Sequence, residues 1–229
     1  TNLSRESHVI AANLDKVFLV ISMILPETKQ EFVDRFLVTC EAYKIKVVIV
    51  INKIDLMKGK AGREYLDYFK SIYKPADYKF IEVSATTGEG IDELKKECSM
   101  GVNLFSGVSG VGKSSIIKAL DPSLNPKTGD ISSAHHQGKH TTTFYEMYHL
   151  TDGGFIIDTP GIKGFGTFDM EKEDIGDYFR EIFEYSRNCR FNNCTHLHEP
   201  HCAIKEAVEN KEIAQWRYTN YCNMMDDES

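Results

Sequence analysis

The chain alternates short apolar runs with longer segments in which apolar residues recur every three or four positions. The short runs contain few polar residues, which is typical of parallel strands buried on both faces. The longer segments have the spacing of amphipathic helices. The expected strands are 16–25, 46–51, 78–83, 102–105, 144–150 and 154–158. The expected helices are 28–43, 61–73, 91–98 and one that begins near Lys113, with further helical segments from Met170 and from Ala203.

Strands that alternate with helices predict an α/β fold, with a mostly parallel sheet and helices on both of its faces. A polar stretch over 121–143 interrupts the pattern, and loops of that length in compact domains are usually functional or mobile. From Tyr185 the helical pattern gives way to a group of cysteines and histidines. We therefore expect a linker over 1–15, the α/β domain over 16–183 and a small helical metal-binding domain over 184–229.

Composition and charge narrow the class of protein. The 229 residues are enough for one α/β domain and a small additional domain, and 41% hydrophobic with 27% charged residues is ordinary for a soluble protein. A net charge of −7 argues against strong non-specific binding to nucleic acid. The chain opens on polar residues, without Met, and no apolar run approaches the ~20 residues that span a bilayer. We expect a fragment of a cytoplasmic protein with no signal peptide and no membrane contact.

A glycine-rich motif, G-x-x-x-x-G-K-S, follows strand 102–105 and opens the next helix. Strand, glycine-rich turn and helix are the context of a phosphate-binding loop, whose backbone N–H groups point at phosphate oxygens. The positive end of the helix dipole faces the same anion. We expect Lys113 to bridge the β- and γ-phosphates and Ser114 to bind Mg²⁺. The predicted contacts are Gly107, Val108, Ser109, Gly110, Val111, Gly112, Lys113, Ser114 and Ser115.

Two short motifs at the ends of other strands indicate guanine. Asn52-Lys53-Ile54-Asp55 follows strand 46–51, and the Asp of an N-K-x-D motif accepts two guanine donors that adenine does not present together. Ser84-Ala85 follows strand 78–83 and is similar to the GTPase motif whose backbone N–H contacts the guanine carbonyl. Ligands of open α/β sheets bind at the carboxyl ends of strands. The position of both motifs directly after a strand therefore supports their assignment as guanine-binding motifs. The predicted base contacts are Asn52, Lys53, Asp55, Ser84 and Ala85.

A third motif begins at the end of strand 154–158. Asp158-Thr159-Pro160-Gly161 resembles the D-x-x-G sequence whose Asp holds Mg²⁺ through water and whose Gly N–H meets the γ-phosphate. The threonine-rich segment 141–143 offers Thr142, or its neighbour Thr141, as the switch threonine. The predicted Mg²⁺ ligands are Ser114, Thr142 and Asp158, and the predicted catalytic residues are Lys113, Thr142, Asp158 and Gly161.

The order of these motifs is permuted. An ordinary GTPase runs phosphate loop, switch threonine, D-x-x-G, N-K-x-D and S-A. This chain has N-K-x-D at 52 and S-A at 84, and only then the phosphate loop at 107 and D-x-P-G at 158. Circular permutation can keep a fold intact, because the termini of a compact domain often lie close together at its surface. The motifs therefore predict a circularly permuted P-loop GTPase domain.

The tail contains a cluster of metal-binding residue types. Of the six cysteines, three lie within fourteen residues of one another beside histidines, whereas Cys40 and Cys98 stand alone and are expected to be inert. Three thiolates and one imidazole suit a closed tetrahedral Zn²⁺ site, which is structural because it keeps no open position. The candidate ligands are Cys189, Cys194 and Cys202, with one of His196, His198 and His201.

With this order of motifs, the chain resembles the RsgA/YjeQ family of circularly permuted GTPases, which act in assembly of the small ribosomal subunit. The matching segments are 12–15, 107–115, 138–143, 189–202 and Arg217-Tyr218. The resemblance implies that His196 is the fourth zinc ligand and that the small ribosomal subunit and its rRNA are partners. The family carries an N-terminal OB-fold that is not seen before the first strand, which implies weaker RNA contact. We expect a monomer.

The resemblance also implies hydrolysis of GTP to GDP and phosphate during late maturation of the small subunit. The alternative is a GTP-regulated protein-interaction module with a structural zinc tail and only incidental hydrolysis. Ile162 stands where Ras-like enzymes place the glutamine that orients the attacking water, so we expect slow hydrolysis alone and stimulation by the subunit. The residues His135, His136 and His140 are either substitutes for that glutamine or solvated loop residues.

Overall fold

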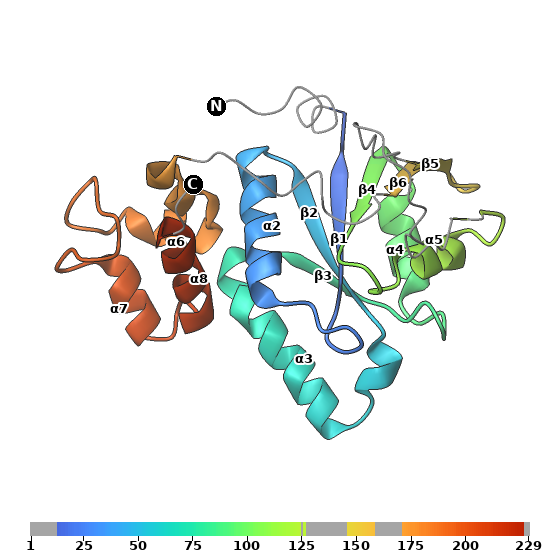
Figure 1. The fold of residues 1–229 in the computed structure, drawn as a ribbon, viewed down its shortest axis with the longest axis horizontal. Coiled ribbons are helices and arrows are strands. Elements are labelled where there is room, and N and C mark those ends of the chain that lie inside the picture. Colours follow the sequence, from blue (N-terminus) through green and yellow to red (C-terminus); the bar gives the residue numbers. More distant parts are fainter. Residues whose placement is uncertain (1–12, 125, 127–145, 159–170, 227–229) are drawn as a thin grey trace, which may run out of the picture.

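The structure is a computed structural model of the chain, and it describes residues 13–124, 126, 146–158 and 171–226. At its centre lies a six-stranded sheet with the strand order β3-β2-β1-β4-β6-β5 (Figure 1). Neighbouring strands pair in parallel, except that β5 and β6 form an antiparallel hairpin at one edge. The mostly parallel α/β architecture predicted from the sequence is confirmed.

The elements of this α/β part follow the predicted alternation. The strands are β1 (Lys16–Ser22), β2 (Lys46–Asn52), β3 (Lys79–Glu82), β4 (Val102–Ser106), β5 (Glu146–His149) and β6 (Phe155–Asp158). The helices are α2 (Gln30–Ala42), α3 (Lys60–Tyr73), α4 (Ile91–Cys98) and α5 (Lys113–Leu120), with 3₁₀ turns η1 (Ile54–Met57) and η2 (Lys74–Ala76). Permutation thus leaves the alternation of strand and helix intact.

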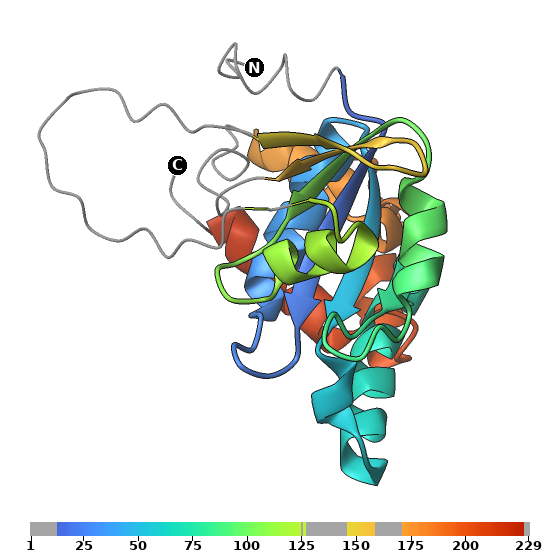
Figure 2. The same ribbon diagram turned by 90° about the vertical axis from the view of Figure 1, so that its right-hand side faces the viewer.

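Helices cover both faces of the sheet, as Figures 1 and 2 show. Side chains of one strand alternate between two cores: Val17, Leu19 and Ile21 pack with α2 and α3, whereas Phe18 and Val20 pack with α4 and α5. This alternation follows from the two-residue period of a strand, and burial on both faces explains the unbroken apolar runs. The buried strands support the predicted nucleotide site at their carboxyl ends.

The first strand is shorter than the predicted 16–25, because it ends at Ser22. The Ser22 N–H donates to Thr28 Oγ1, and the Ser22 hydroxyl donates to the carbonyl of Ile24. These side-chain bonds turn the backbone away from the sheet. Leu25 is consequently 70% exposed although it belongs to the apolar run. The run therefore continues into a loop beside the nucleotide site, which hydrophobicity alone does not reveal.

A C-terminal module, residues 171–226, packs beside α2. It contains the 3₁₀ turn η3 (Lys172–Tyr178) and the helices α6 (Arg180–Ser186), α7 (Ala203–Glu209) and α8 (Gln215–Asp226). The helical stretch expected from Ala203 is divided in two, with Lys211 in the left-handed region at φ 61°. A third core joins Val38 of α2 to Ile175, Phe179 and Ile182. This core contains residues on both sides of position 183, where the domain boundary remains a prediction.

Among the described residues, none of the helices combines the length and apolar character required to cross a membrane.

Gly90, at the start of α4, provides a test of the backbone geometry near the base-reading motifs. Its φ is +74°, and a Cβ there would lie 1.9 Å from the backbone oxygen of Glu82. Gly88 also has a positive φ, +84°, but no atom lies within 4 Å of its Cβ position. Gly90→Ala should lower the free energy of unfolding by about 2–4 kcal/mol, because a steric clash adds to left-handed strain.

Gly88→Ala serves as the matched control and should lower the free energy of unfolding by only about 1–2 kcal/mol, from the strain alone. Urea denaturation followed by circular dichroism measures both values. An equal decrease in the free energy of unfolding of the two variants would contradict the tight contact between Gly90 and Glu82 of β3.

Candidate functional site

The phosphate-binding loop runs from the end of β4 to the start of α5. Gly107 and Gly112 both have positive φ, 156° and 97°. A Cβ on Gly107 would lie 2.2 Å from the backbone oxygen of Val20, and one on Gly112 would lie 2.4 Å from Asn52 Nδ2. Glycine is required at both positions because the loop packs directly against neighbouring segments. The N-terminus of α5 is thereby placed at the carboxyl end of the sheet, where it can attract an anion.

Lys113, the first residue of α5, bends its ammonium back over the loop. Its Nζ donates to the carbonyls of Gly107, at 2.8 Å, and Val108, at 3.3 Å. Burial lowers the pKa of Lys113, and the nearby charge of Asp158 acts in the opposite direction. A phosphate oxygen is a stronger acceptor for this ammonium than a carbonyl, because the bond joins two charges.

Asn52 links the base motif to the phosphate loop. It ends β2, is buried, and donates from Nδ2 to the Val111 carbonyl at 2.8 Å. Its Oδ1 accepts from the Ala85 N–H at 3.2 Å. The Val111 side chain is fully buried in the core with α4 and α5, so the carbonyl has a fixed position. One side chain therefore aligns three predicted motifs.

Lys53 makes a second link. Its backbone lies in the left-handed region at φ 65°, and its Nζ donates to the Gly110 carbonyl at 2.8 Å and to the Leu25 carbonyl. The ammonium thus ties the phosphate loop to the loop that follows β1. The Lys53 stem lies between these two loops and can form one wall of a base pocket.

Asp55 is held by the serine of the S-A motif. The Ser84 hydroxyl donates to Asp55 Oδ1 at 2.6 Å and accepts from the Thr87 N–H at 3.1 Å. Ser84 is buried, whereas Asp55 is half-buried. The carboxylate is therefore oriented by the protein and still has acceptor capacity for a base.

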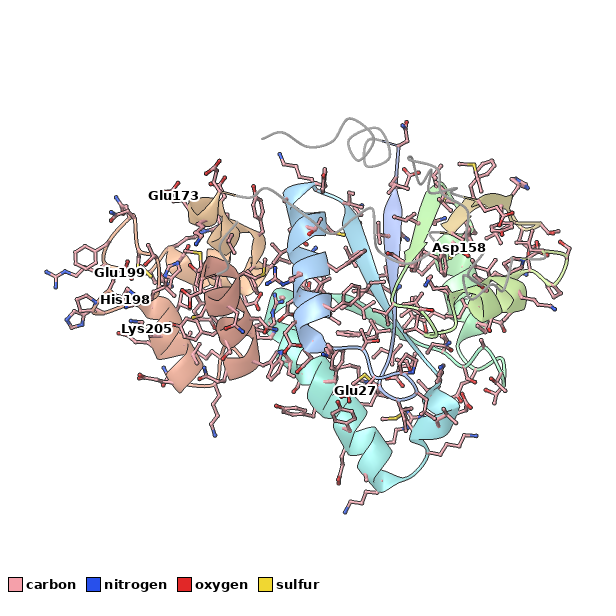
Figure 3. All side chains as sticks on the ribbon, viewed as in Figure 1. Glu27, Asp158, Glu173, His198, Glu199 and Lys205 are labelled. Atoms are coloured by element: carbon pink, nitrogen blue, oxygen red, sulfur yellow. The ribbon has the colours of Figure 1, made fainter. Side chains whose placement is uncertain are left out.

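The predicted magnesium residues are only partly described. Asp158 ends β6 directly beside Phe105 of β4, and Ser114 lies half-buried in the first turn of α5. Figure 3 shows Asp158 among the strands, far from His198 in the C-terminal module. The other residues considered for hydrolysis lie outside the described residues: Thr141, Thr142, Gly161, the apolar Ile162, and the candidate substitutes His135, His136 and His140.

In the C-terminal module, Cys189, Cys194, His196 and Cys202 form what we call the metal cluster. Their ligand atoms all lie within 4.8 Å of one another. His196 Nδ1 is 3.6 Å from Cys189 Sγ and 3.4 Å from Cys202 Sγ. A tetrahedral zinc ion with ordinary bond lengths would separate sulfur and nitrogen ligands by about 3.5 Å. These two sulfur–nitrogen distances therefore fit such an ion.

The structure distinguishes among the three candidate histidines. His196 is buried with the cysteines, whereas His198 and His201 are exposed and do not join the cluster. Burial lowers the pKa of His196, so the imidazole is neutral at pH 7 and offers a lone pair. Burial also raises the pKa of the Cys194 thiol to about 12, so binding of a cation must be accompanied by loss of the thiol protons.

Sequence reasoning named Tyr218 and the segment 189–202 as matches to the family, but it did not predict which residues support this cluster. The Tyr218 hydroxyl donates to the His196 carbonyl and the Tyr221 hydroxyl to the Thr195 carbonyl, both at 2.7 Å. Glu199 accepts from the Thr195 N–H at 2.8 Å. The three-residue spacing of the tyrosines on one helix was an available signal, but their acceptors become known only from the fold.

Fold and site together define the class of protein. A P-loop opens α5 at the carboxyl end of a mostly parallel sheet, and Asn52 ties it to two motifs that precede it in the chain. A potential metal centre lies in a separate helical module. This is the arrangement of a circularly permuted P-loop GTPase with a C-terminal metal-binding module.

Comparisons with known proteins agree. The family described as RsgA GTPase matches residues 1–168, and the chain belongs to this family. It is 52% identical, over 99% of its length and 73% of the relative's, to the small ribosomal subunit biogenesis GTPase RsgA 2 of Bacteroides thetaiotaomicron. Identity to the RsgA of Flavobacterium psychrophilum is 50%, over 100% of this chain and 70% of the relative.

Solved structures show the same fold. YjeQ from Thermotoga maritima is 37% identical with a TM-score of 0.78, and the match covers 93% of this chain and 70% of YjeQ. YloQ, described as a circularly permuted GTPase, is 33% identical with a TM-score of 0.75, over 93% of this chain and 67% of YloQ. The permuted fold predicted from the motif order is confirmed.

Proposed function

We propose that this protein hydrolyses GTP to GDP and phosphate during late maturation of the small ribosomal subunit. Its membership of the RsgA GTPase family supports the reaction, and the names of its relatives support the process. The observation that carries the proposal is the double hydrogen bond of Asn52, which aligns the phosphate loop with the guanine-reading motifs. The partners in this proposal are the small subunit and its rRNA. We propose that the protein binds them as a monomer in the cytoplasm.

The residues of the proposed nucleotide site have different roles. Asp55, oriented by Ser84, reads guanine, while Lys53 and Ala85 complete the base pocket. The backbone of residues 107–115 cradles the phosphates, and Lys113 stabilises charge that develops on the β- and γ-phosphates. Ser114, Thr142 and Asp158 would hold Mg²⁺, which neutralises phosphate charge when bound. Their hydroxyl and carboxylate oxygens are the donors that this hard cation prefers.

We further propose that the metal cluster holds a structural zinc ion. Cys189, Cys194, His196 and Cys202 supply the donor set that tetrahedral zinc prefers, and their spacing leaves no open position for a substrate. A small module has little core of its own, so the metal would contribute much of its folding free energy.

Guanine specificity can be tested at Asp55. Asp55→Asn replaces one acceptor by a donor, so one charge-assisted hydrogen bond is lost and the new amide N–H₂ faces a guanine donor; GTP affinity should fall by about 100-fold or more. Xanthosine triphosphate, whose base carries a carbonyl acceptor in place of the exocyclic amine of guanine, should gain affinity. Competition binding with GTP, XTP and ATP measures both changes. Equal affinity of the wild type for ATP and GTP would show that the base assignment is wrong.

Hydrolysis should be slow without a partner. Ile162 has no polar atom with which to orient water, so we expect turnover on the order of 10⁻³ s⁻¹, as in unstimulated GTPases. Small subunits should raise it by about 100-fold or more by fixing Thr142 and the attacking water. Phosphate release with small subunits, and with large subunits as the control, measures this effect. His→Ala variants at 135, 136 and 140 test whether these residues replace the missing glutamine. Fast turnover by the protein alone would contradict the proposal.

Removal of one metal ligand should loosen the module but spare the nucleotide site. Cys194→Ala should release zinc and increase proteolytic cleavage after about residue 185, because the module loses its metal cross-link. GDP affinity should change little, since the buried residues of these two cores all belong to the α/β part. Cys40→Ala, a buried cysteine away from the cluster, is the control. Less than half an equivalent of zinc in the wild type would refute the metal assignment.

A further inference from the structure

Helix α8 carries two stripes of polar side chains that serve different parts of the molecule. Arg217 and Asn220 point to α2 of the α/β part, where both contact Asp34. Tyr218 and Tyr221 point to the metal cluster and bind the carbonyls of His196 and Thr195. Spacings of one and three residues rotate side chains by about 100° and 300° around a helix, so one short helix presents both stripes.

The first stripe forms a buried charged group. Arg217 is fully buried and donates to both oxygens of Glu181, at 2.5 and 3.0 Å, and to Asp34 Oδ1 at 2.7 Å. Asp34 also accepts from the Tyr73 hydroxyl, at 2.9 Å, and from the Asn220 amide. Asp34 is fully buried as well, although it belongs to α2. A charge in such a place is stable only while all its partners stay in position.

The second stripe fixes the backbone on which a metal ligand is mounted. His196 has φ 61°, which is uncommon for a residue other than glycine. The Tyr218 hydroxyl binds the carbonyl of this same residue, and Tyr221 binds the carbonyl before it. Helix α8 therefore helps to hold the backbone from which the imidazole points to the cysteines. Support of this kind for a ligand typically changes metal affinity by about 10–100-fold when it is removed.

We propose that α8 couples metal binding to the docking of the C-terminal module on α2, so that Asp34, in the α/β part, raises the affinity of the metal cluster. Metal holds the loop that the tyrosines bind, and this loop holds α8 in the position that places Arg217 against Asp34. Such coupling is reciprocal: docking must strengthen metal binding by the same factor by which metal strengthens docking. The inference rests on the proposed zinc site, and it is independent of GTP hydrolysis.

The first test measures zinc affinity by competition with a chromophoric chelator. Asp34→Asn keeps the size of the side chain but removes the negative charge opposite Arg217, and it should weaken zinc binding by about tenfold or more. Asp67→Asn, the same change on the exposed face of α3, should leave zinc affinity within about twofold. Unchanged zinc affinity in Asp34→Asn would overturn the coupling. Absence of zinc binding in the wild type would overturn it together with the metal site.

The second test asks whether the stabilising effect of Asp34 depends on metal. Asp34→Asn should lower the unfolding temperature of zinc-loaded protein but have little effect after zinc is removed with a chelator, because an undocked module no longer buries Asp34. A purely structural contact would give the same shift in both states, and that result would also overturn the proposal.

Tyr218→Phe provides a variant outside the buried charges, in case Asp34→Asn does not fold. Loss of this single hydroxyl should also weaken zinc binding by about tenfold, whereas Tyr68→Phe on exposed α3 should not. GDP affinity should stay at the wild-type value in Asp34→Asn, Asp67→Asn, Tyr218→Phe and Tyr68→Phe. Its measurement in parallel shows whether the α/β part of each variant is folded. Unchanged zinc affinity in Tyr218→Phe would remove the link between α8 and the metal cluster.

Discussion

The Asn52 side chain donates to the Val111 carbonyl and accepts from the Ala85 N–H, so a single buried amide holds the phosphate loop against the S-A loop. These segments lie 59 and 33 residues from Asn52 along the chain. Gly112 is glycine because a Cβ there would strike this amide. Loss of the amide would leave a buried carbonyl and a backbone N–H without partners, and would release two loops from one another.

The hydrogen bonds of Asn52 help to explain why the fold tolerates circular permutation. The site requires four strand ends at one edge of the sheet, and the order β3-β2-β1-β4-β6-β5 supplies them through pairing rather than through chain order. Asp158 lies next to the strand that leads into the phosphate loop because β6 pairs with β4, although α5 and β5 come between these strands in the sequence. What the fold must conserve is therefore strand adjacency together with the Asn52 bridge, and the place where the chain is opened has little influence on either.

The apolar runs and the order of the motifs predicted the mostly parallel sheet and its permuted fold, because both are local properties of the sequence, and the nucleotide contacts stay predictions. Features that depend on contacts between residues far apart in the sequence were not predicted by local patterns. The apolar run after β1 leaves the sheet because Ser22 bonds to Thr28 and Ile24. Spacing alone left three candidate histidines; the family resemblance implied His196, and its position beside the cysteines agrees. The role of Arg217 required the fold, since its partner Asp34 is 183 residues away.

The position of the module also follows from these contacts. Asp34 lies on α2, and α2 begins just after the loop whose Leu25 carbonyl accepts from Lys53. Lys53 in turn donates to Gly110 of the phosphate loop. The C-terminal module is therefore docked on the helix that leads out of the nucleotide site, and packed elements connect the two. Such continuity permits energetic coupling, but coupling exists only if a ligand at one site binds more tightly when the other is occupied. The buried charges of α2 and α8 supply a contact of the kind that can couple docking of the module to metal binding, because breaking a buried ion pair is strongly destabilising.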